Sequence, residues 1–452
     1  MPSRGSSRPS GLSDVAATSR PAPVSFGEAF RYWLKLGCIS FGGPAGQIAI
    51  MHAELVEKRR WISERRFLHA LNYCMLLPGP EAQQLATYIG WLMHGTPGGI
   101  VAGALFVLPS LLLLIALTWI YLVYGSVPVI AGVLWGIKPA VVAIVAFAAY
   151  RIGSRALTNG LLWLIAAASL VATMLQVPFP LIVFSAGVIG FVGGKVAPRL
   201  FATGGHGGGN QKSYGASLID DDTPTPAHAR FSPLRLARVL IVGLVLWSGV
   251  IALLSAATLK DMGWFFSKAA LLTFGGAYAV LPYVFQGSVL HYGWLSAPQM
   301  MDGLALGEST PGPLIMIVAF VGFVGGWNAA LFGPEHLVAS GAIAASVATY
   351  FTFLPSFVFI LAGGPLVERT HDDLRFTAPL TAITAAVVGV ILNLARFFGY
   401  HVFWPQGFGV HADWAALAIG AGAFIALYRF KAGIIKTIAI CGGSGAILHL
   451  LG

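Results

Sequence analysis

The sequence predicts an all-α integral membrane protein made of two homologous halves, and three observations indicate this class. Of the 452 residues, 57% are hydrophobic and only 10% are charged, whereas soluble domains carry about 25% charged residues. Apolar stretches long enough to cross a bilayer follow one another along most of the chain. The halves also repeat glycine, proline and tryptophan positions at a constant offset. A soluble enzyme, a secreted disulfide scaffold and a disordered regulator are therefore excluded.

About 13 apolar segments are expected, in the order six, one and six. They span residues 26–51, 66–93, 98–124, 127–150, 160–177, 179–197, 235–258, 262–287, 300–326, 337–363, 376–398, 412–429 and 432–451. Residues 1–25 predict a disordered cytoplasmic tail, because they are rich in Ser, Pro, Gly and Arg and lack the apolar core of a signal peptide. An organellar transit peptide is the alternative for this acid-poor tail.

The polar residues 198–234 predict a flexible cytoplasmic linker. This linker separates a first transporter half at 26–197 from a connecting transmembrane helix at 235–258 and a second half at 262–451. The formal net charge of +10 comes from Lys and Arg placed between apolar runs, where they set membrane topology, so nucleic-acid binding is not expected.

The internal repeat is recognised by subtraction. A shift of 233 residues places Phe41-Gly42-Gly43 on Phe274-Gly275-Gly276 and Pro78-Gly79-Pro80 on Pro311-Gly312-Pro313. Seven apolar segments lie between equivalent points, and an odd number of crossings turns the second copy upside down. Inverted repeats are a recurrent plan of secondary transporters, with the substrate site near the bilayer midplane.

Positive charges orient the chain. With a cytoplasmic N-terminus, the N-terminal arginines, Arg151, Arg155 and the linker lie inside, as the positive-inside rule requires. The segment Lys58-Arg59-Arg60 would then lie outside, unless the first two segments of each half are re-entrant hairpins broken at Phe-Gly-Gly and Pro-Gly-Pro. Full crossings with one tolerated exception are the alternative, and the sequence leaves both open.

Two symmetric pairs of helix breaks predict an oxyanion site. A proline-rich break at membrane depth is tolerated only where the freed backbone groups are buried in protein or line a polar cavity. A half-helix that starts there presents free N–H groups and a positive dipole end to an anion. Kinks that serve only helix packing are the alternative. The candidate anion-binding residues beside the breaks are Ser40, Gly42, Gly43, Pro44, Gln47, Pro78, Gly79, Pro80, Gln83, Gln84, Thr273, Gly275, Gly276, Pro311, Gly312 and Pro313.

Charged residues inside apolar segments are functional candidates by default. Lys35 and Lys268 are equivalent in the repeat and are predicted to bind the anion and balance its charge, with snorkelling to the interface as the alternative. Glu81 and Glu308 flank the Pro-Gly-Pro breaks and are predicted proton-coupling residues, with structural hydrogen bonding as the alternative.

Other polar residues of the apolar segments are given structural roles. Lys138 is interpreted as a packed or snorkelling lysine, and the repeat equivalents His69 and Asp302 as interfacial residues. No H-E-x-x-H, G-x-S-x-G or P-loop motif occurs, and the three cysteines show no metal-site spacing. We therefore expect no enzyme activity, no cofactor and no metal site.

At these residues the sequence resembles the chromate ion transporter family in its long, two-half form. The resemblance depends on Phe41-Gly42-Gly43-Pro44 with Gly46-Gln47, on Arg60-Trp61, and on the Leu-Pro-Gly-Pro-Glu-Ala-Gln-Gln run at 77–84, and it covers residues 26–451. It implies a bacterial inner-membrane protein that exports chromate and confers chromate resistance, with oppositely oriented halves. The second half departs from the motif, since Ala277, Val280 and Leu314 stand where Pro44, Gln47 and Glu81 do.

The expected activity is secondary transport. One midplane oxyanion site is exposed alternately to each side, and protons or the membrane potential drive the cycle. Proton-coupled import of sulfate or a related oxyanion is the alternative, because chromate and sulfate share charge and shape. The expected partners are the chromate or sulfate dianion, protons and the lipid bilayer, with a homodimer left open. A membrane-embedded enzyme that reduces chromate is disfavoured, because cofactor ligands are missing.

Overall fold

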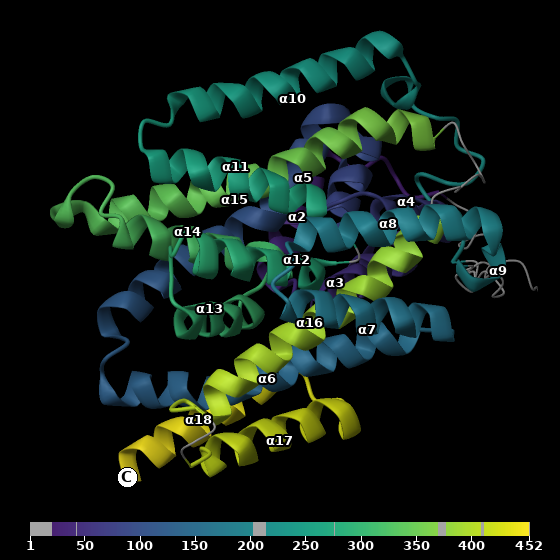
Figure 1. The fold of residues 1–452 in the computed structure, drawn as a ribbon. Coiled ribbons are helices and arrows are strands. Elements are labelled where there is room, and N and C mark those ends of the chain that lie inside the picture. Colours follow the sequence, from purple (N-terminus) through teal and green to yellow (C-terminus); the bar gives the residue numbers. More distant parts are fainter. Residues whose placement is uncertain are drawn as a thin grey trace, which may run out of the picture.

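The structure is a computed structural model that describes residues 20–41, 43–201, 214–274, 276–368, 377–407 and 411–451. Within these ranges every named element is a helix, and the axes of most long helices are roughly aligned across the view, without regard to chain direction (Figure 1). An isolated parallel bridge between Ile62 and Ile219 is the only strand-like pairing of the described residues. The all-helical class predicted from the composition is confirmed.

The first half places its helix break where the sequence predicts it. Its elements are α2 (Phe26–Ile39), α3 (Gly43–His52), the π-helix η1 (Ala53–Lys58), α4 (Glu64–Leu76), α5 (Glu81–Tyr124), α6 (Pro128–Ala156), α7 (Gly160–Met174) and α8 (Phe179–Val196). The gap between α4 and α5 contains Pro78-Gly79-Pro80, since two prolines bar a continuous helix. α5 itself consists of two arms, because His94 and Gly95 leave the helical region of φ/ψ space.

The two arms of α5 fold back on each other. A Cβ atom on Gly90 would lie 2.5 Å from Cβ of Ala102, and one on Gly103 would lie 2.3 Å from Oγ1 of Thr87. Such close approach requires glycine. The turn at 94–95 agrees with the expected boundary between segments 66–93 and 98–124.

The connection from the first half to the second runs through residues 198–253, of which 202–213 lie outside the described ranges. It contains α9 (Pro198–Phe201), the 3-10 helix η2 (Ala227–Ala229) and α10 (Pro233–Leu253). α10 lies along the outside of the molecule and packs against α15 (Figure 1).

The second half repeats the first. Its elements are α11 (Ala257–Leu272), α12 (Ala277–Phe285), the π-helix η3 (Gln286–His291), α13 (Ala297–Ser309), η4 (Leu314–Met316), α14 (Ile317–Asn328), η5 (Pro334–His336), α15 (Leu337–Val367), α16 (Thr377–Phe403), α17 (Trp414–Arg429) and α18 (Ile434–Leu451). A shift of 233 residues carries the bounds of η1 onto η3 and those of α4 onto α13. Positive φ also recurs in pairs, at 50° and 62° for Arg60 and Gly293 and at 127° and 111° for Gly79 and Gly312.

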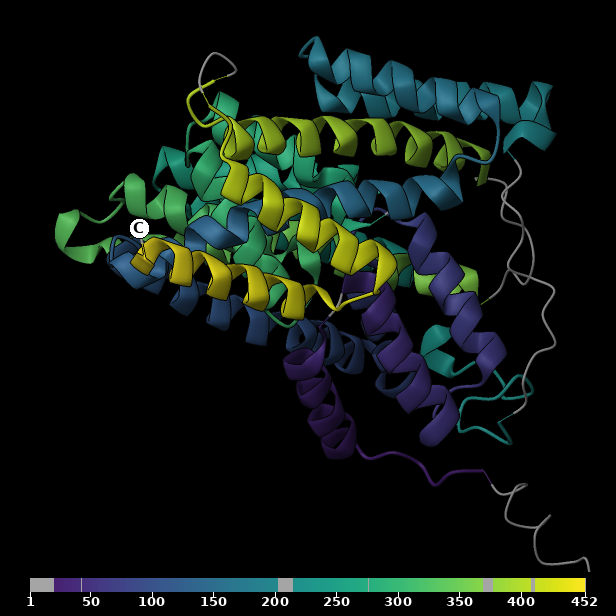
Figure 2. The ribbon, with the colours of Figure 1, turned by 90° about the horizontal axis from the view of Figure 1, so that it is seen from below.

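Equivalent long helices of the two halves pack antiparallel. A Cβ atom on Gly153 of α6 would meet Val388 of α16, and one on Gly399 of α16 would meet Val142 of α6. α16 also packs against α7 and α8, while α17 and α18 lie across α6 (Figure 2). The main apolar core therefore combines side chains from both halves.

Helix length separates two kinds of element. Among the described residues, six helices are long and apolar enough to cross a membrane, at 81–124, 128–156, 179–196, 233–253, 334–367 and 378–403. By contrast, α2, α4 and α13 have 14, 13 and 13 residues. At 1.5 Å per residue these are about 20 Å long, too short for a hydrocarbon core of about 30 Å.

The described part of the linker is ordered by hydrogen bonds to the first half. The amides of Leu218 and Ile219 donate to the carbonyls of Arg60 and Trp61 at 2.9 and 3.0 Å. The amide of Ser63 donates back to Ile219 at 2.9 Å. These bonds dock the linker on the first half near Ile219, and residues 202–213 lie outside the described ranges.

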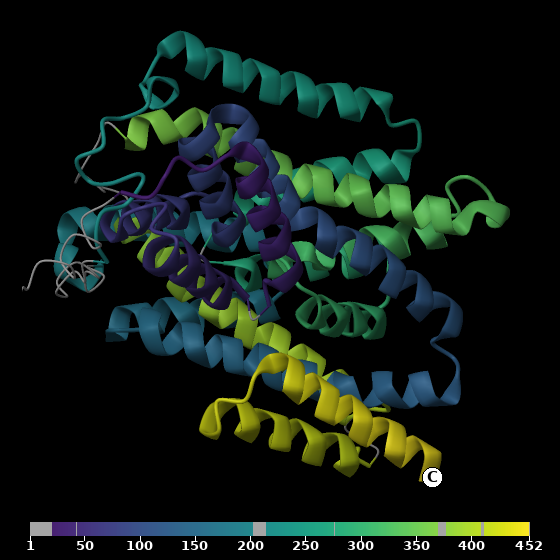
Figure 3. The same cartoon turned by 180° about the vertical axis from the view of Figure 1, so that it is seen from behind.

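Three polar segments meet at one end of the molecule (Figure 3). Ser63 donates through its hydroxyl to Asp221 at 2.6 Å, and Arg20 pairs with Asp222 at 2.5 Å. The start of the described chain, the basic loop at 58–60 and the linker thus lie together. Of the predicted tail, residues 1–19 lie outside the described ranges.

Candidate anion-binding site

The helix breaks of the two halves meet, and each is completed by the other half. The amide of Gly79 donates to the carbonyl of Thr273, and the amide of Gly312 donates to the carbonyl of Ser40, both at 2.8 Å. These bonds are equivalent, because a shift of 233 residues relates Gly79 to Gly312 and Ser40 to Thr273. The Pro-Gly-Pro break of one half is therefore bonded to the Phe-Gly-Gly break of the other.

We call the place where the Pro-Gly-Pro and Phe-Gly-Gly breaks of the two halves meet the crossing. Two serines pack against its glycines. A Cβ atom on Gly79 would lie 2.4 Å from Oγ of Ser356, and one on Gly312 would lie 2.6 Å from Cβ of Ser110. Ser110 and Ser356 are themselves equivalent at a shift of 246 residues. With φ of 127° and 111°, both glycines also adopt a backbone conformation that other residues rarely adopt. The crossing thus has space only for glycine at these two positions.

Gln47 ties the two halves together at the crossing. Its Nε2 donates to the carbonyl of Gly312 at 2.5 Å and to that of Ser40 at 3.1 Å. The side chain is fully buried, on helix α3 directly after the first break. Val280 has no amide to make the equivalent bonds, so the crossing is asymmetric in its side chains.

Unpartnered polar atoms gather beside the breaks. Gln83 and Gln84 are 0% exposed, and their Nε2 atoms donate to Thr87 Oγ1 at 3.0 Å and to the Pro78 carbonyl at 2.8 Å. Among the described residues, the Oε1 atoms of both glutamines and the hydroxyl of Ser110 are buried without a hydrogen-bond partner. Buried polar groups are normally paired. Of these three atoms only the Ser110 hydroxyl can donate to an anion, because an amide oxygen only accepts hydrogen bonds.

Helix N-termini surround the crossing. α3 begins at Gly43, α5 at Glu81, α12 at Ala277 and η4 at Leu314, each directly after one of the breaks. The N-terminal turn of a helix carries free N–H groups and a partial positive charge, which together favour an anion. Gly42 and Gly275 lie outside the described residues, so the candidate site is described without them.

The structure does not bring the two predicted lysines to this site. Lys35 on α2 and Lys268 on α11 are exposed, whereas Ser40 and Thr273 at the ends of the same helices are 0% exposed. The prediction that these lysines bind the anion at the breaks is therefore not supported by their positions. Neutral hydrogen-bonding groups and helix ends form the buried part of the site.

The two predicted carboxylates lie beside the breaks in different surroundings. Glu308 is 8% exposed, and the hydroxyl of Tyr278 donates to its Oε1 at 2.5 Å. Glu81 is partly buried as the first residue of α5. The structural alternative, a hydrogen bond that fixes the carboxylate, is thus present at Glu308.

Two ion pairs between the halves were not predicted from the sequence. Lys138 Nζ lies 3.7 Å from Asp302 Oδ2, and Arg66 Nη1 lies 3.5 Å from Glu368 Oε2. Asp302 is 4% exposed and is therefore buried within the protein, and Lys138 has this carboxylate as a charged partner. Glu368 directly follows the last turn of α15. An ionisable residue beside an apolar segment is a functional candidate, and this signal could have pointed to Glu368.

Metal binding is not suggested by the side chains that are described. In the described ranges no group of three His, Cys, Asp or Glu side chains is placed to hold a metal ion. The three cysteines are free thiols.

Comparison with known proteins finds similarity to chromate transporters in both halves of the chain. The family model for chromate transporters matches residues 27–191 and 260–446, which correspond to the two halves. A chromate transport protein of Pseudomonas aeruginosa is 32% identical over 450 residues, covering 97% of this chain and 96% of the relative. A chromate transport protein of Cupriavidus metallidurans is 30% identical over 382 residues, covering 83% and 84%. No solved structure matches the chain.

These relatives are named as transport proteins, which points to a transporter rather than an enzyme. A probable chromate transport protein of Synechococcus elongatus is also 28% identical over 391 residues. Together with the six long apolar helices, the match indicates a multi-pass membrane protein. The chain belongs to the chromate transporter family.

Proposed function

We propose that this protein exports chromate across the bacterial inner membrane by alternating access and thereby gives chromate resistance. The observation that carries the proposal is the reciprocal pair of bonds between the halves, Gly79 to Thr273 and Gly312 to Ser40. A site shared by two repeats can be exposed first to one side and then to the other as the repeats move. The choice of chromate as the substrate follows the names of the relatives.

The crossing has the chemistry that a tetrahedral dianion needs. Chromate offers only acceptor oxygens, and the Ser110 hydroxyl is a buried donor without a protein partner among the described residues. The Nε2 of Gln83 uses one N–H for Thr87, so its second N–H can donate to the anion. Helix N-termini supply partial positive charge without a bound cation. The site thus binds the anion through dipoles and hydrogen bonds.

We further propose that the two halves are oppositely oriented and that the short helices at the breaks are re-entrant. The antiparallel packing of the equivalent helices α6 and α16 supports the inversion. The lengths of α2, α4 and α13 support re-entry. Re-entry keeps the basic loop at 58–60 on the cytoplasmic side together with the linker and the N-terminus, which satisfies the positive-inside rule.

The membrane potential favours export. Moving a dianion out of a cell that is negative inside releases about 4.6 kcal/mol per 100 mV, at about 2.3 kcal/mol per charge. Proton coupling through Glu81 or Glu308 is therefore an addition to the cycle rather than a requirement.

The test is uptake of labelled chromate and labelled sulfate into inside-out vesicles, with and without a pH gradient. Chromate accumulation is expected, and it should be lost in Gln84→Glu, which places a like charge at the site at constant side-chain size. Gln299→Glu is the matched control, because Gln299 lies at the exposed start of α13. Faster sulfate transport in the opposite direction would replace this proposal by oxyanion import, and flux that ignores the pH gradient would remove proton coupling.

A further inference from the structure

We infer that the ion pairs Arg66–Glu368 and Lys138–Asp302 are two gates that close the central crossing, one toward each end of the molecule. Each pair joins a cation of the first half to a carboxylate of the second. Their role in transport rests on the proposed function, whereas their positions and the experiment below do not.

The first gate lies beside the linker. Arg66 on α4 and Glu368 at the end of α15 have side chains that are 16% and 9% exposed. The hydroxyl of Tyr88 donates to Glu368 Oε1 at 2.5 Å, so both carboxylate oxygens are engaged. Arg66 also donates from Nη2 to the carbonyl of Thr223 in the linker at 2.6 Å. This gate therefore holds the first half, the second half and the linker together.

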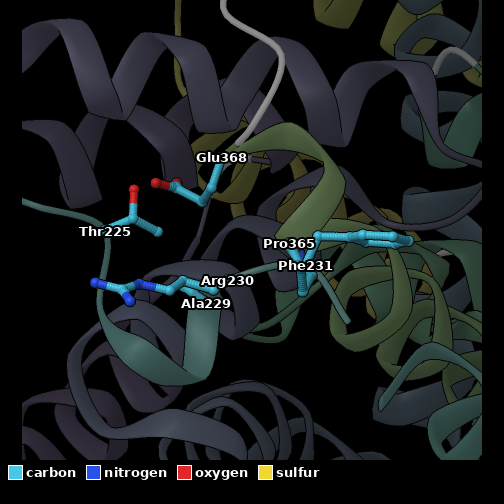
Figure 4. Close-up of a pocket in the computed structure, with 6 residues that line it drawn as sticks. All are labelled: Thr225, Ala229, Arg230, Phe231, Pro365 and Glu368. Atoms are coloured by element: carbon cyan, nitrogen blue, oxygen red, sulfur yellow. The ribbon is translucent and has the colours of Figure 1, made fainter. Parts of the chain in front are cut away.

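A cavity leads to the first gate from the linker side. It has a volume of about 310 Å³ and is lined by Thr225, Ala229, Arg230, Phe231, Pro365 and Glu368 (Figure 4). The Glu368 carboxylate forms part of its wall, and the Arg230 guanidinium and the Thr225 hydroxyl come from the linker. A solute that enters this cavity thus meets Glu368, the carboxylate of the first gate.

The second gate is built in a similar way, except that Asp302 Oδ1 is buried without a hydrogen-bond partner among the described residues. Asp302 on α13 pairs with Lys138 on α6 and accepts a hydrogen bond from the Tyr121 hydroxyl at 3.0 Å. The Asp302 side chain is 5% exposed and that of Lys138 is 28% exposed. A tyrosine thus supports the carboxylate in both gates.

The internal repeat relates the places where the two gates lie, which we call the joints: α4 beside the end of α15, and α13 beside the end of α5. Shifts of 233 and 246 residues carry His69 onto Asp302 and Tyr121 onto Val367. His69 Nε2 lies 3.3 Å from the Val367 carbonyl, which is the counterpart of the contact between Asp302 and Tyr121. Glu368 directly follows Val367. The contact of α4 with the end of α15 and the contact of α13 with the end of α5 are therefore equivalent in the repeat.

The gates lie at opposite ends, with the crossing between them. A Cβ atom on Gly99 of α5 would meet Leu361 of α15, and one on Gly103 would meet Phe357, so these helices run antiparallel. Their C-terminal ends, which carry the two joints, point in opposite directions. On each helix the serine that contacts a break, Ser110 or Ser356, precedes its joint by 11 or 12 residues. At 1.5 Å per residue each gate is therefore about 16–18 Å from the crossing.

Charge chemistry gives the expected behaviour of each gate. A buried ion pair stays closed while both partners are present, and removal of one partner leaves the other charge buried and unpaired. The equilibrium then shifts toward the state in which that charge reaches water. Loss of Glu368 should open the linker side, and loss of Asp302 should open the opposite side.

The experiment measures accessibility rather than transport. In a background with Cys38→Ser, Cys74→Ala and Cys441→Ala, the reporter Ser110→Cys is labelled with a membrane-impermeant maleimide in intact cells and in inside-out vesicles. Ser110 is 0% exposed, so the parent should label slowly from both sides. Glu368→Gln should raise labelling about tenfold from the linker side only, and Asp302→Asn about tenfold from the other side only.

Controls separate gating from misfolding. Glu54→Gln removes the surface pair of Glu54 with Lys58 and should leave labelling unchanged. The milder changes Tyr88→Phe and Tyr121→Phe remove one hydroxyl each and should raise labelling on the same sides by a smaller factor. The exchange of Arg66→Glu with Glu368→Arg should return labelling to the parent rate.

Two results would overturn the gates: labelling that rises from the same side in Glu368→Gln and Asp302→Asn, or labelling that rises in none of the four variants. No chromate is used in this assay. Gates that behave as expected in a protein without chromate flux would therefore refute the proposed function and leave the gates in place.

Discussion

The amide of Gly79 and the carbonyl of Thr273 lie 2.8 Å apart and join the Pro-Gly-Pro break of the first half to the Phe-Gly-Gly break of the second. Gly312 and Ser40 form the equivalent bond in the other direction. A break in a membrane helix leaves backbone groups that must be satisfied inside the protein. Here the partner of each break is supplied by the other half.

Gly79→Ala and Gly312→Ala should each destabilise the protein by at least about 2 kcal/mol, because a Cβ atom meets both a positive φ and a neighbouring serine. Thermal unfolding of the detergent-solubilised protein measures this. The control is Gly249→Ala in α10, where a Cβ atom meets nothing within 4 Å and a small gain is expected. Equal stability of all three variants would contradict the close packing at the crossing.

Ser110→Ala should weaken chromate binding about tenfold without lowering the unfolding temperature. The Ser110 hydroxyl is buried without a protein partner among the described residues, so its removal costs the fold little. A hydrogen bond to a charged group contributes about 1.5–3 kcal/mol. The KM for chromate in vesicles is the measurement, with Ser346→Ala on the exposed face of α15 as control. An unchanged KM would remove Ser110 from the site.

Lys35→Met and Lys268→Met should change chromate flux by less than about threefold. Both side chains are exposed and lie away from the buried breaks, and exposed charges contribute little to binding energy. The rate of chromate uptake at saturating concentration in vesicles decides this point. Loss of flux in both variants would return the lysines to the anion site.

Arg65→Cys and Pro298→Cys should label from opposite sides of the membrane. The two residues are exposed and equivalent at a shift of 233, each at the start of a short helix after a π-helix. Inverted, re-entrant repeats place Arg65 on the linker side and Pro298 on the other. Labelling of both from one side would contradict the inverted arrangement, and labelling of Arg65→Cys from outside would contradict re-entry.

The breaks and the duplication could be predicted because their signals are local. Two prolines around Gly79 stop a helix whatever its neighbours are, and the same pattern at Gly312 makes coincidence improbable. The exposure of Lys35 also has a local signal. Lys35 follows Arg31 by one helical turn, on the face opposite to the buried Trp33 and Leu36, which indicates an exposed stripe.

The ion pairs and the docked linker could not be predicted in this way. Arg66 and Glu368 are 302 residues apart, and no periodicity in a single sequence shows which helices face each other. The polar composition of the linker predicts solvation, but it does not show that Ile219 finds a backbone partner in the loop at 60–63. These features depend on tertiary packing, which only the folded chain specifies.

The reciprocal bonds at the breaks have a consequence for how such a chain can be built. A single half lacks the acceptor for its own Pro-Gly-Pro amide, so a half-length protein would need a second copy of itself to complete its fold. Joining both copies in one polypeptide replaces a bimolecular association by a high effective concentration. It also frees each copy to diverge, and Gln47 opposite Val280 is such a difference between the two halves.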